Sequence, residues 1–586
     1  MKKSMFLFGA LFAVGLSFTA CSSDNDVAEN GAIKNNSNGQ RYIALSIVLP
    51  NDLAGTRATN DNFKNGLASE FAVNSVKVFV FEGNATSAVL QEVLTPDLGS
   101  WTNNANGNNV TTRQAFVSRL TKSYSTPYVL AVVNDNGLSY TVGTTTYADI
   151  LAATTSSYTT TVSGTQYFTM TNSPLSSKIG GSTDPASPNV NILVAATTYE
   201  TEAEANAASP SEIYVERIAA KVTVQNAGAS TTSVSTSQDS QSGTILWWTI
   251  DNTEPSAYFV RNVSTKVKGY FSYLNSHVSS DSYKYRFIGA SAISSQYRIY
   301  WAEDPNYSND LTGALTGYTT TKNGLGDSNP MYCLENTFDL AHQVFNHTTR
   351  VVLAVQFNSG TDFYVINGAT GTLYDNAGMT SQIQTAIVND ALIQDAINHH
   401  NLSAVTLNSS DVTVSFNAVN AKGVVSVNSI TLPTAVVEKL DLDGDSDHDT
   451  DDETAIATLL GTVASNINTS NVVEFYDDGK AYYTIRIKHF GDDLTPWSTT
   501  YNTGGGIYDV DNSGTITSAD ETEYLGRYGV VRNNWYNINV SSIKRIGSPV
   551  VTSVSGDTTT DDTVDQYIAY AINILAWAYR NQDENL

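Results

Sequence analysis

Residues 214–224 read YVERIAAKVTV, and this stretch indicates the fold class. Valine, isoleucine, threonine and tyrosine make up most of it, and such residues favour the pleated backbone of a strand. Similar apolar runs recur along the chain at 41–49 (RYIALSIVL), 74–81 (NSVKVFVF), 128–133 (YVLAVV), 349–357 and 481–487. Their spacing predicts β-sandwiches with long loops.

The composition agrees with that prediction. Tyr, Thr, Ser, Asn, Val and Gly are plentiful while Lys and Glu are scarce, which favours strands and turns over surface helices. One helix is expected between Thr380 and His400, where Ile383, Ile387 and Ile397 lie at helical spacing. The expected fold is therefore mainly β with a few helices, and 586 residues allow two large β domains.

Charge and cysteine content exclude some functions. The formal net charge is −26 with 15% charged residues, so the chain would repel phosphate backbones, and nucleic acid is not an expected partner. Only Cys21 and Cys333 occur, which rules out a disulfide framework. Cys333 is expected to be a small buried side chain.

The N-terminus predicts export. Lys2 and Lys3 precede an apolar stretch from Met5 to Phe18, and Thr19-Ala20-Cys21 follows before a polar segment. This pattern predicts a signal peptide over residues 1–20 and a lipobox whose Cys21 thiol carries acyl chains such as palmitate. A plain secretory signal remains the alternative, because Phe18 stands where a lipobox usually has Leu. No other segment of the sequence predicts a membrane span.

Polar stretches suggest how the chain is divided. Residues 21–57 are expected to hold a polar tether and the first strand, and residues 225–245, rich in Ser, Thr, Gln and Gly, mark a boundary. The predicted divisions after the signal peptide are a propeptide (21–57), an N-terminal sandwich (58–235), a C-terminal sandwich with inserted acidic loops (236–550), and a linker with a last strand (551–586).

The C-terminal tail has two periodicities. After the polar linker 551–565, large apolar side chains alternate at Ile568, Tyr570, Ile572 and Ile574. That alternation predicts a strand, yet near-helical spacing runs through the same stretch at Tyr567, Ala571, Ile574 and Trp577. Periodicity alone therefore leaves both open, and an element packed on its own domain is also possible.

Residues 509–520 (DVDNSGTITSAD) follow the pattern of a calcium loop. Gly514 falls at position six, where the loop turns sharply, and the expected ligands are Asp509, Asp511, Ser513, Thr515 (through its carbonyl), Thr517 and Asp520. The preceding YNTGGG cannot be an entering helix, and position twelve is Asp instead of Glu, so the loop is closer to dockerin-type single loops. A structural calcium clamp is expected here, with a solvated acidic turn as the alternative.

A second acidic run, residues 441–453, repeats carboxylates at alternate positions. The candidate ligands are Asp441, Asp443, Asp445, Asp447, Asp449 and Asp452. These charges repel one another without a cation, which favours calcium. Ser446 occupies the glycine position, however, and charge runs are commonly solvated loops, so both interpretations stay open.

The sequence offers no catalytic constellation. There is no G-x-S-x-G, H-E-x-x-H or phosphate-binding Walker loop, and the seven histidines are scattered. Cys333 has His342 and His347 nearby in sequence, within a run that predicts strand and turn. We therefore expect a protein that is not an enzyme and has no cofactor besides calcium.

Several blocks together resemble the shaft subunits of Bacteroidales type V pili, in particular the short-fimbria fimbrillin family. The blocks span nearly the whole mature chain, at 74–81, 128–135 (YVLAVVND), 168–174 (FTMTNSP), 214–224, 297–307 (YRIYWAEDPNY), 332–343 (YCLENTFDLAHQ), 530–550 and 571–586. The acidic residues after Cys21 also resemble the surface-export signal of Bacteroidetes lipoproteins. Both acidic loops lie outside these blocks.

The resemblance implies two transthyretin-like β-sandwiches and export as an outer-membrane lipoprotein. An arginine-specific protease would cut in the loop after the first strand, where the matching bond is Arg57-Ala58. The C-terminal strand of another subunit, carrying Ile568, Tyr570, Ile572, Ile574 and Trp577, would then fill the vacated groove. Head-to-tail donation of this kind builds a filament.

The implied function is a structural pilus-shaft subunit that supports adhesion. Its partners would be other copies, anchor and tip subunits, and host or bacterial surface ligands, with membrane contact only through the transient lipid. The alternative is a surface lipoprotein that binds glycans through its Trp and Tyr residues.

Overall fold

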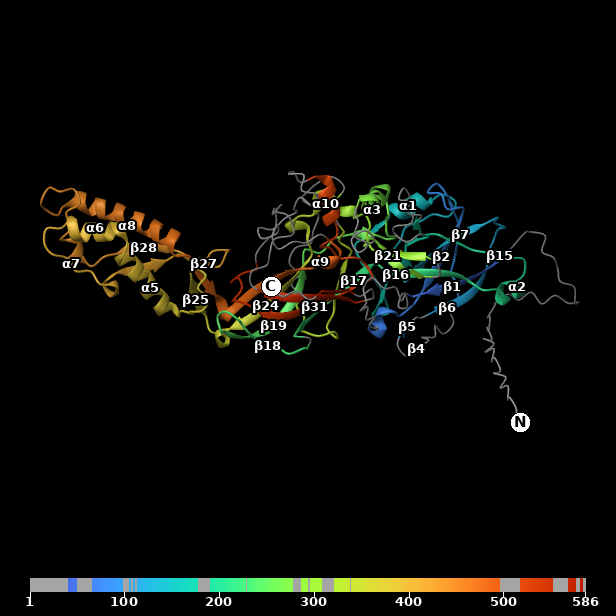
Figure 1. Ribbon diagram of the computed structural model, residues 1–586, viewed down its shortest axis with the longest axis horizontal. Coiled ribbons are helices and arrows are strands. Elements are labelled where there is room, and N and C mark those ends of the chain that lie inside the picture. The colour runs from blue at the N-terminus through green and yellow to red at the C-terminus, as the bar shows by residue number, and fades with distance from the viewer. Residues whose placement is uncertain are drawn as a thin grey trace, which may run out of the picture.

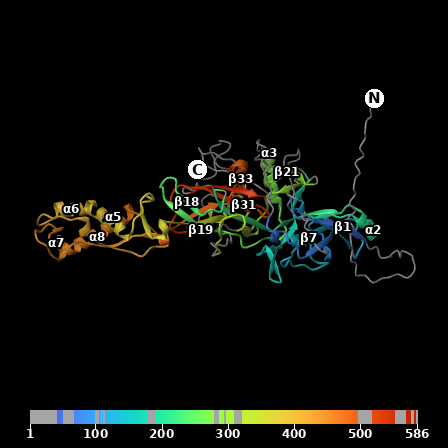
Figure 2. The ribbon, with the colours of Figure 1, turned by 90° about the horizontal axis from the view of Figure 1, so that it is seen from below.

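The computed structural model describes residues 41–49, 66–97, 105–106, 109–110, 113–177, 190–227, 229–277, 286–293, 296–307, 321–337, 339–495, 517–551, 568–575 and 580–582. The molecule is elongated, with an N-terminal half at one end, a C-terminal half in the middle and a smaller lobe at the other end (Figures 1 and 2). Among the described residues, no helix is long and apolar enough to span a bilayer. The chain is mainly β, as predicted.

The N-terminal half is built on one nine-stranded sheet. Seven strands follow the order β15-β1-β16-β11-β7-β2-β3, while β14 pairs with β7 and β6 pairs with β1. Its strands are β1 (Tyr42–Val48), β2 (Val76–Glu82), β3 (Leu90–Leu94), β6 (Arg113–Arg119), β7 (Pro127–Val133), β11 (Met170–Asn172), β14 (Val194–Ala195), β15 (Thr198–Tyr199) and β16 (Ser211–Arg217). Alternate residues of β1, β2, β7 and β16 point into one apolar core. The predicted strands at 41–49, 74–81 and 128–133 are confirmed.

Smaller elements decorate this half. They are η1 (Ala68–Glu70), β4 (Ala105–Asn106), β5 (Asn109–Val110), α1 (Tyr147–Ala152), β8 (Thr154–Thr155), β9 (Thr159–Val162), β10 (Thr165–Phe168), β12 (Leu175–Ser176), β13 (Val190–Asn191) and α2 (Glu202–Ala207). Each of the two helices begins with a capping box, at Thr146 and Thr201, which satisfies free backbone N–H groups of the first turn.

The C-terminal half is a sandwich of two sheets. One has the order β23-β17-β31-β32-β33 and the other β18-β19-β24-β30, and side chains from both form one core. The strands are β17 (Ala219–Asn226), β18 (Ser233–Ser235), β19 (Ser242–Asp251), β23 (Met331–Leu334), β24 (Arg350–Phe357), β30 (Lys480–Arg486), β31 (Trp535–Ile543), β32 (Ile568–Leu575) and β33 (Arg580–Gln582). β24 and β30 confirm the strands predicted at 349–357 and 481–487.

Further short elements lie around this sandwich. They are β20 (Ala257–Tyr258), α3 (Thr265–His277), β21 (Ile288–Ile293), β22 (Gln296–Ile299), η2 (Pro305–Tyr307), η3 (Leu340–His342), η4 (Phe345–His347), α9 (Gly491–Leu494) and α10 (Ser518–Tyr524). Side chains from α3, β21, β22, η2, η3 and α9 contribute to a second apolar cluster, which also contains Trp301 and Leu525.

The chain passes between the halves at Ile218, earlier than the sequence boundary near residue 235. The run 214–224 is two strands, because β16 pairs inside the N-terminal half and β17 pairs with β31 and β23. The polar stretch 225–245 instead contains β18 and the start of β19. The polar composition of residues 225–245 therefore reflects exposed strand residues and not a linker. The continuous apolar run 214–224 gave no sign that the chain passes from one half to the other within it.

A lobe, residues 363–476, is inserted between β24 and β30 and has an apolar core of its own. It holds β25 (Phe363–Ile366), α5 (Asn376–Val388), α6 (Ala391–His399), η6 (Ser409–Asp411), β26 (Thr413–Phe416), β27 (Val424–Val425), β28 (Val427–Thr431), α7 (Thr434–Val437), α8 (Thr450–Ser470) and β29 (Val473–Tyr476). The expected helix 380–400 is α5 and α6, because the Asp390 carboxylate accepts the Leu392 N–H at 2.9 Å and starts a new helix.

Two turns form the neck of the lobe, η5 (Asn358–Gly360) and η7 (Asp477–Gly479). The two turns lie against each other at Gly479, whose φ is +65°. A Cβ atom at this position would lie 2.3 Å from the Phe357 carbonyl oxygen. Only glycine fits there. The chain therefore leaves and re-enters the sandwich at one point.

Candidate functional site

The first strand, β1, is held in the N-terminal half on both sides. It pairs antiparallel with β6 along its whole length, from Tyr42 opposite Arg119 to Val48 opposite Arg113. On the other side Leu45–Val48 pair in parallel with Ser211–Tyr214 of β16, and Tyr42 and Ile43 pair with β15. The sheet is therefore interrupted if β1 is removed.

The side chains of β1 also fill the core. Ile43, Leu45 and Ile47 are 0% exposed, and Leu49 just beyond the strand is 1% exposed. Burial of each such side chain contributes about 1.5–3 kcal/mol, so their loss would leave a costly apolar groove. The groove would be bordered by unpaired backbone groups of β6 and β16.

The bond predicted to be cut lies between this strand and the rest of the chain. Arg57 and Ala58 fall in the segment 50–65, outside the described residues, as does the predicted lipid site Cys21. The next described element is η1. In sequence, therefore, cleavage at Arg57 separates β1 from everything that follows it.

The C-terminal tail forms a strand, not a helix. β32 pairs antiparallel with β31 through eight residue pairs, from Ile568 opposite Ile543 to Leu575 opposite Trp535, and β33 folds back onto it. The predicted residues Ile568, Tyr570, Ile572 and Ile574 all lie in β32, while Trp577 lies outside the described residues. In this chain the tail rests on its own domain.

A buried ion pair lies where the two halves meet, and sequence reasoning missed it. Lys221 of β17 is 2.7 Å from the Glu70 carboxylate of η1, and both side chains are almost completely enclosed. Tyr332 donates to the same carboxylate at 2.5 Å, and the Lys221 ammonium lies 3.7 Å from the Trp535 ring centre. Burial lowers the pKa of Lys221, and Glu70 acts in the opposite direction. The available signal was Lys221 itself, a charge inside an apolar strand.

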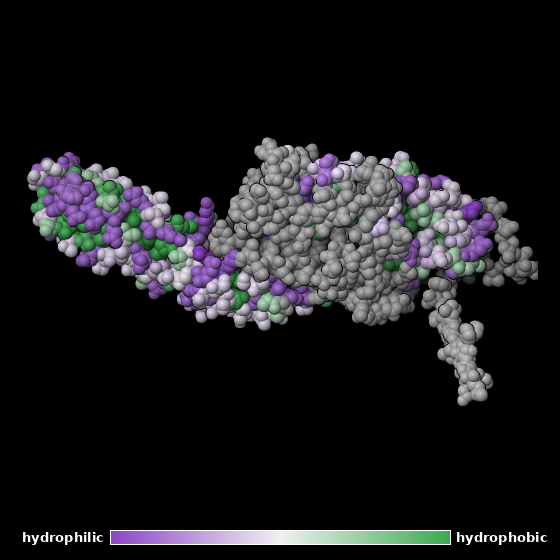
Figure 3. Space-filling model, viewed as in Figure 1, coloured by the Kyte–Doolittle hydropathy of each residue, from purple (hydrophilic) through white to green (hydrophobic). Residues whose placement is uncertain are grey.

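The acidic run 441–453 lies at the tip of the lobe, where hydrophilic residues gather (Figure 3). Its carboxylate oxygens approach one another within 4.8 Å in three overlapping groups, Asp441 with Asp443 and Asp452, Asp443 with Asp449 and Asp451, and Asp445 with Asp447 and Asp449. The neighbouring Asp445 carboxylate raises the pKa of Asp447. Ser446 has a φ of +77°, so it adopts the backbone conformation that glycine supplies in a calcium loop.

The tip continues directly into α8. Asp449 caps this helix by accepting the Asp451 N–H at 2.7 Å, and the buried Asp452 carboxylate accepts the Leu442 N–H at 2.5 Å. This arrangement gives the loop the exiting helix of a calcium loop. The sequence predicted an inserted acidic loop, and the structure shows that a whole lobe carries it.

Only the end of the other predicted calcium loop can be described. Asp509, Asp511, Ser513 and Thr515 lie outside the described residues. The Asp520 carboxylate accepts the Thr517 N–H at 2.8 Å and its hydroxyl at 2.7 Å. α10 begins at Ser518, within the last residues of this loop.

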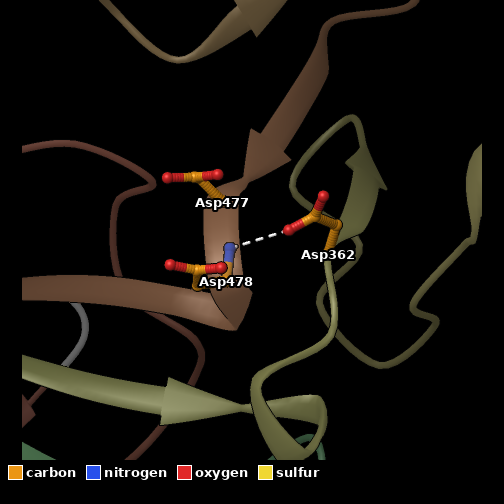
Figure 4. Close-up of side chains that lie close together, drawn as sticks. All are labelled: Asp362, Asp477 and Asp478. Carbon is orange, nitrogen blue, oxygen red and sulfur yellow. Dashed lines mark hydrogen bonds between the residues drawn. The ribbon is translucent and has the colours of Figure 1, made fainter.

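A third acidic group was not predicted from the sequence. Asp362, Asp477 and Asp478 meet at the neck of the lobe, and the Asp478 N–H donates to Asp362 at 2.7 Å (Figure 4). Asp478 also pairs with Lys480 at 2.6 Å. More than a hundred residues separate Asp362 from Asp477, so no local pattern could reveal this group.

Cys333 lacks the properties of a nucleophile. It is 3% exposed on β23, and burial raises the pKa of its thiol to about 12. The thiolate needed for nucleophilic attack is therefore not populated at neutral pH. The His342 ring instead stacks with Tyr307, and the His347 ring lies tilted against Tyr307.

Two buried carboxyls, Glu254 and Asp304, lie beside Tyr307 and predict a pH dependence of stability. Burial raises the pKa of Asp304 to about 8, and it raises the pKa of Glu254 together with the nearby Asp304 charge. The folded chain thus holds a proton that the unfolded chain releases near pH 4, and stability falls as pH rises through this window.

Asp304→Asn should remove the share of this dependence that comes from Asp304. Relative to wild type, the variant should gain up to about 1.4 kcal/mol of unfolding free energy per pH unit between about pH 5 and pH 8. Urea unfolding at several pH values measures it, with Glu438→Gln, an exposed carboxyl, as control. Parallel profiles for Asp304→Asn and wild type would contradict the assignment.

Residues 499–583 match the family described as "Major fimbrial subunit protein type IV, Fimbrillin, C-terminal". This segment includes β31 and β32. No curated protein matches the chain.

Several solved structures of bacterial proteins are similar to this chain. A putative cell adhesion protein from Parabacteroides distasonis is 11% identical, with 93% of this chain and 99% of that chain covered and a TM-score of 0.34. A fimbrial assembly protein from the same species is 13% identical (54% and 82% covered, TM-score 0.27). The tip fimbrial protein Mfa3 from Porphyromonas gingivalis, with C-terminal truncation, is 10% identical (54% and 79% covered, TM-score 0.24).

The C-terminal match agrees with the resemblance in the sequence blocks at 530–550 and 571–586. Residues 499–583 are therefore similar to the C-terminal part of the fimbrillins.

Proposed function

We propose that this protein is a shaft subunit of a pilus and polymerises by protease-triggered strand exchange. The observation that carries the proposal is the position of β1, which has neighbours on both sides, fills the core with four apolar side chains, and precedes the Arg57-Ala58 bond. Removal of such a strand creates a groove that another strand can fill.

The tail gains backbone partners when it moves. On its own domain β32 pairs with β31 on one side, and among the described residues its other side is paired only with the three residues of β33. In the place of β1 it would lie between β6 along its full length and β16 along half of it. Because the second site offers more ladder hydrogen bonds and an apolar groove, exchange can proceed without an external energy source.

Export completes the proposed pathway. Cys21 would carry the lipid that holds the precursor at the outer membrane, and cleavage at Arg57 would release the subunit from it. The shaft would then consist of copies of this chain, with anchor and tip subunits at its ends and with surface ligands as adhesion targets. Donation from one copy to the next does not close into a ring, which fits a fibre.

Arg57→Ala should block this pathway at its first step. Wild-type protein treated with an arginine-specific protease should form fibres in negative-stain images and a ladder of heat-resistant oligomers on gels, while the variant stays monomeric because β1 keeps its place. Arg545→Ala, at an exposed arginine outside the N-terminal half, is the matched control for loss of an arginine. Fibres from Arg57→Ala would contradict the assigned cleavage site.

We also propose that calcium binds the two acidic loops and stabilises them. In the lobe, a cation would neutralise the repulsion among Asp441, Asp443 and Asp452, whose oxygens already lie within 4.8 Å of one another. In the other loop, Asp509 and Asp511 with Asp520 would provide the charges. Oxygen ligands of this kind suit Ca²⁺, and the role would be structural.

Titration of chelator-treated protein with calcium should release heat and raise the unfolding temperature. Stabilisation at a hundred times the dissociation constant is about 2.7 kcal/mol for one site. The double variant Asp441→Asn/Asp443→Asn should lose the lobe site alone, whereas Glu438→Gln, an exposed carboxyl close by, should titrate as wild type. Absence of heat at about millimolar calcium would exclude both sites.

A further inference from the structure

One run of chain, residues 211–226, lies beside both elements that the proposed assembly uses. Its first strand, β16, pairs in parallel with β1, and its second strand, β17, pairs in parallel with β31. β31 in turn holds β32, the tail strand. Along the molecule β1, β16, β17 and β31 follow one another in this order (Figure 1). The acceptor end and the donor end of a subunit are thus joined through one run.

We propose that residues 211–226 carry tension along the filament, and that buried polar contacts around Ile218 hold this run to both halves of the subunit. The proposal rests on the strand exchange described above. It concerns what keeps an assembled subunit from being pulled apart, which exchange itself does not explain.

The acceptor junction is loaded along the strands. A donated tail is pulled at its N-terminal end, because the linker 551–567 precedes it in sequence. In the place and direction of β1 it runs parallel to β16, which is pulled at its C-terminal end toward Ile218. Parallel strands pulled at opposite ends must slide past each other, so their hydrogen bonds share the load and do not open one at a time.

The second junction has the same geometry. β17 is pulled at its N-terminal end by β16, and β31 is pulled at its C-terminal end, where the chain continues to the linker. The two are parallel over five residue pairs, from Lys221 opposite Trp535 to Gln225 opposite Asn539. This ladder is therefore also loaded lengthwise.

The crossing at Ile218 is where the two sheets join, and buried contacts surround it. Glu216 lies 3.0 Å from Arg261, and both side chains are 0% exposed. On the other side of Ile218 is the Lys221–Glu70 pair. These pairs hold the run to its surroundings immediately before and after the crossing, where the partners are desolvated and costly to separate.

One contact bridges the crossing directly. Arg217, the last residue of β16, donates through Nη1 to the Asn533 side chain at 2.9 Å and through Nε to the Glu70 carbonyl at 2.5 Å. Asn533 lies two residues before β31. Arg217 therefore ties the end of β16 to the start of β31 without passing through Ile218.

The test uses single filaments held at constant load. Arg217→Lys keeps the charge but loses the planar fork that reaches two acceptors. Asn533→Gly removes the acceptor and suits a residue whose φ is +59°. Lys77→Gln is the control. It removes the ion pair between Lys77 and Asp135 (2.7 Å), which lies outside residues 211–226.

The Arg217→Lys and Asn533→Gly variants should assemble as wild type does. At loads that wild-type and Lys77→Gln filaments withstand, their filaments should lengthen in steps and break at least about tenfold sooner. A factor of ten in lifetime requires about 1.4 kcal/mol, and loss of a buried charged contact costs more than that. Unchanged lifetimes and lengths in both variants would overturn the tension path and leave strand exchange standing. Failure of the wild-type chain to form filaments would overturn both.

Discussion

Deletion of residues 566–586 should abolish fibre formation and leave a folded subunit. The donor strand β32 would be missing, so cleavage at Arg57 would open a groove that no partner can fill. The C-terminal core should survive, because most of its described side chains come from β17, β19, β24, β30 and β31. Gel ladders and negative-stain images measure the loss, and circular dichroism with thermal melting measures the fold.

Two comparisons sharpen this experiment. Ile572→Asp should weaken assembly strongly because alternate residues of the donated strand enter the apolar groove, whereas Asn573→Asp, on the opposite face, should assemble normally. The truncated subunit should also stop growth when mixed with wild type, since it can accept a strand but cannot donate one. Unfolding of the truncated chain would show instead that the tail is an ordinary part of its own domain.

Lys221→Met should be among the most destabilising single substitutions in the described part of the chain. It removes the ammonium partner of the buried Glu70 carboxylate, and loss of one partner of a buried pair costs about 3–5 kcal/mol. Other partners of Glu70, among them Tyr332, the Leu67 N–H and the Arg217 charge, limit the loss. Urea unfolding of the unprocessed chain measures the change.

The control is Lys77→Met, which removes a pair of the same 2.7 Å length with its lysine 33% exposed. Because exposed pairs are screened by water, this change should cost about 1 kcal/mol or less. The double variant Glu70→Leu/Lys221→Met should recover much of the loss, since it removes both buried charges together. Equal destabilisation by Lys221→Met and Lys77→Met would show that burial of the Lys221–Glu70 pair does not increase its contribution to stability.

Local patterns predicted individual elements well. The strands at 74–81, 128–133, 349–357 and 481–487 are present, because side chains alternating between a core and a second face dictate the pleated backbone locally. The sequence predicted helical structure between Thr380 and His400 but not that it is divided into two helices. Asp390 ends the first and caps the second with its side chain. Periodicity likewise could not tell whether the tail was strand or helix; its pairing with β31 decides that.

Contacts between distant residues lay beyond these patterns. The lobe was visible only as an acidic run and a helical stretch, because its core joins residues from Tyr364 to Phe475 that share no local motif. The same holds for Glu70 with Lys221, for Asp362 with Asp477, and for Glu254 with Asp304. Each group comes together only when sheets and turns close, so its charge balance and pKa values depend on packing.

The sequence by itself determined that this chain is mainly β, that its tail could supply an alternating apolar strand, and that its C-terminal segment is of the fimbrillin type. These properties follow from residue types at short spacing, which act through local backbone preference and side-chain alternation. Only the tertiary structure decided where the halves meet, that β1 lies between β6 and β16, and that the tail rests on β31. Those outcomes depend on burial and strand pairing between segments far apart in sequence, and such contacts exist only after the chain has folded.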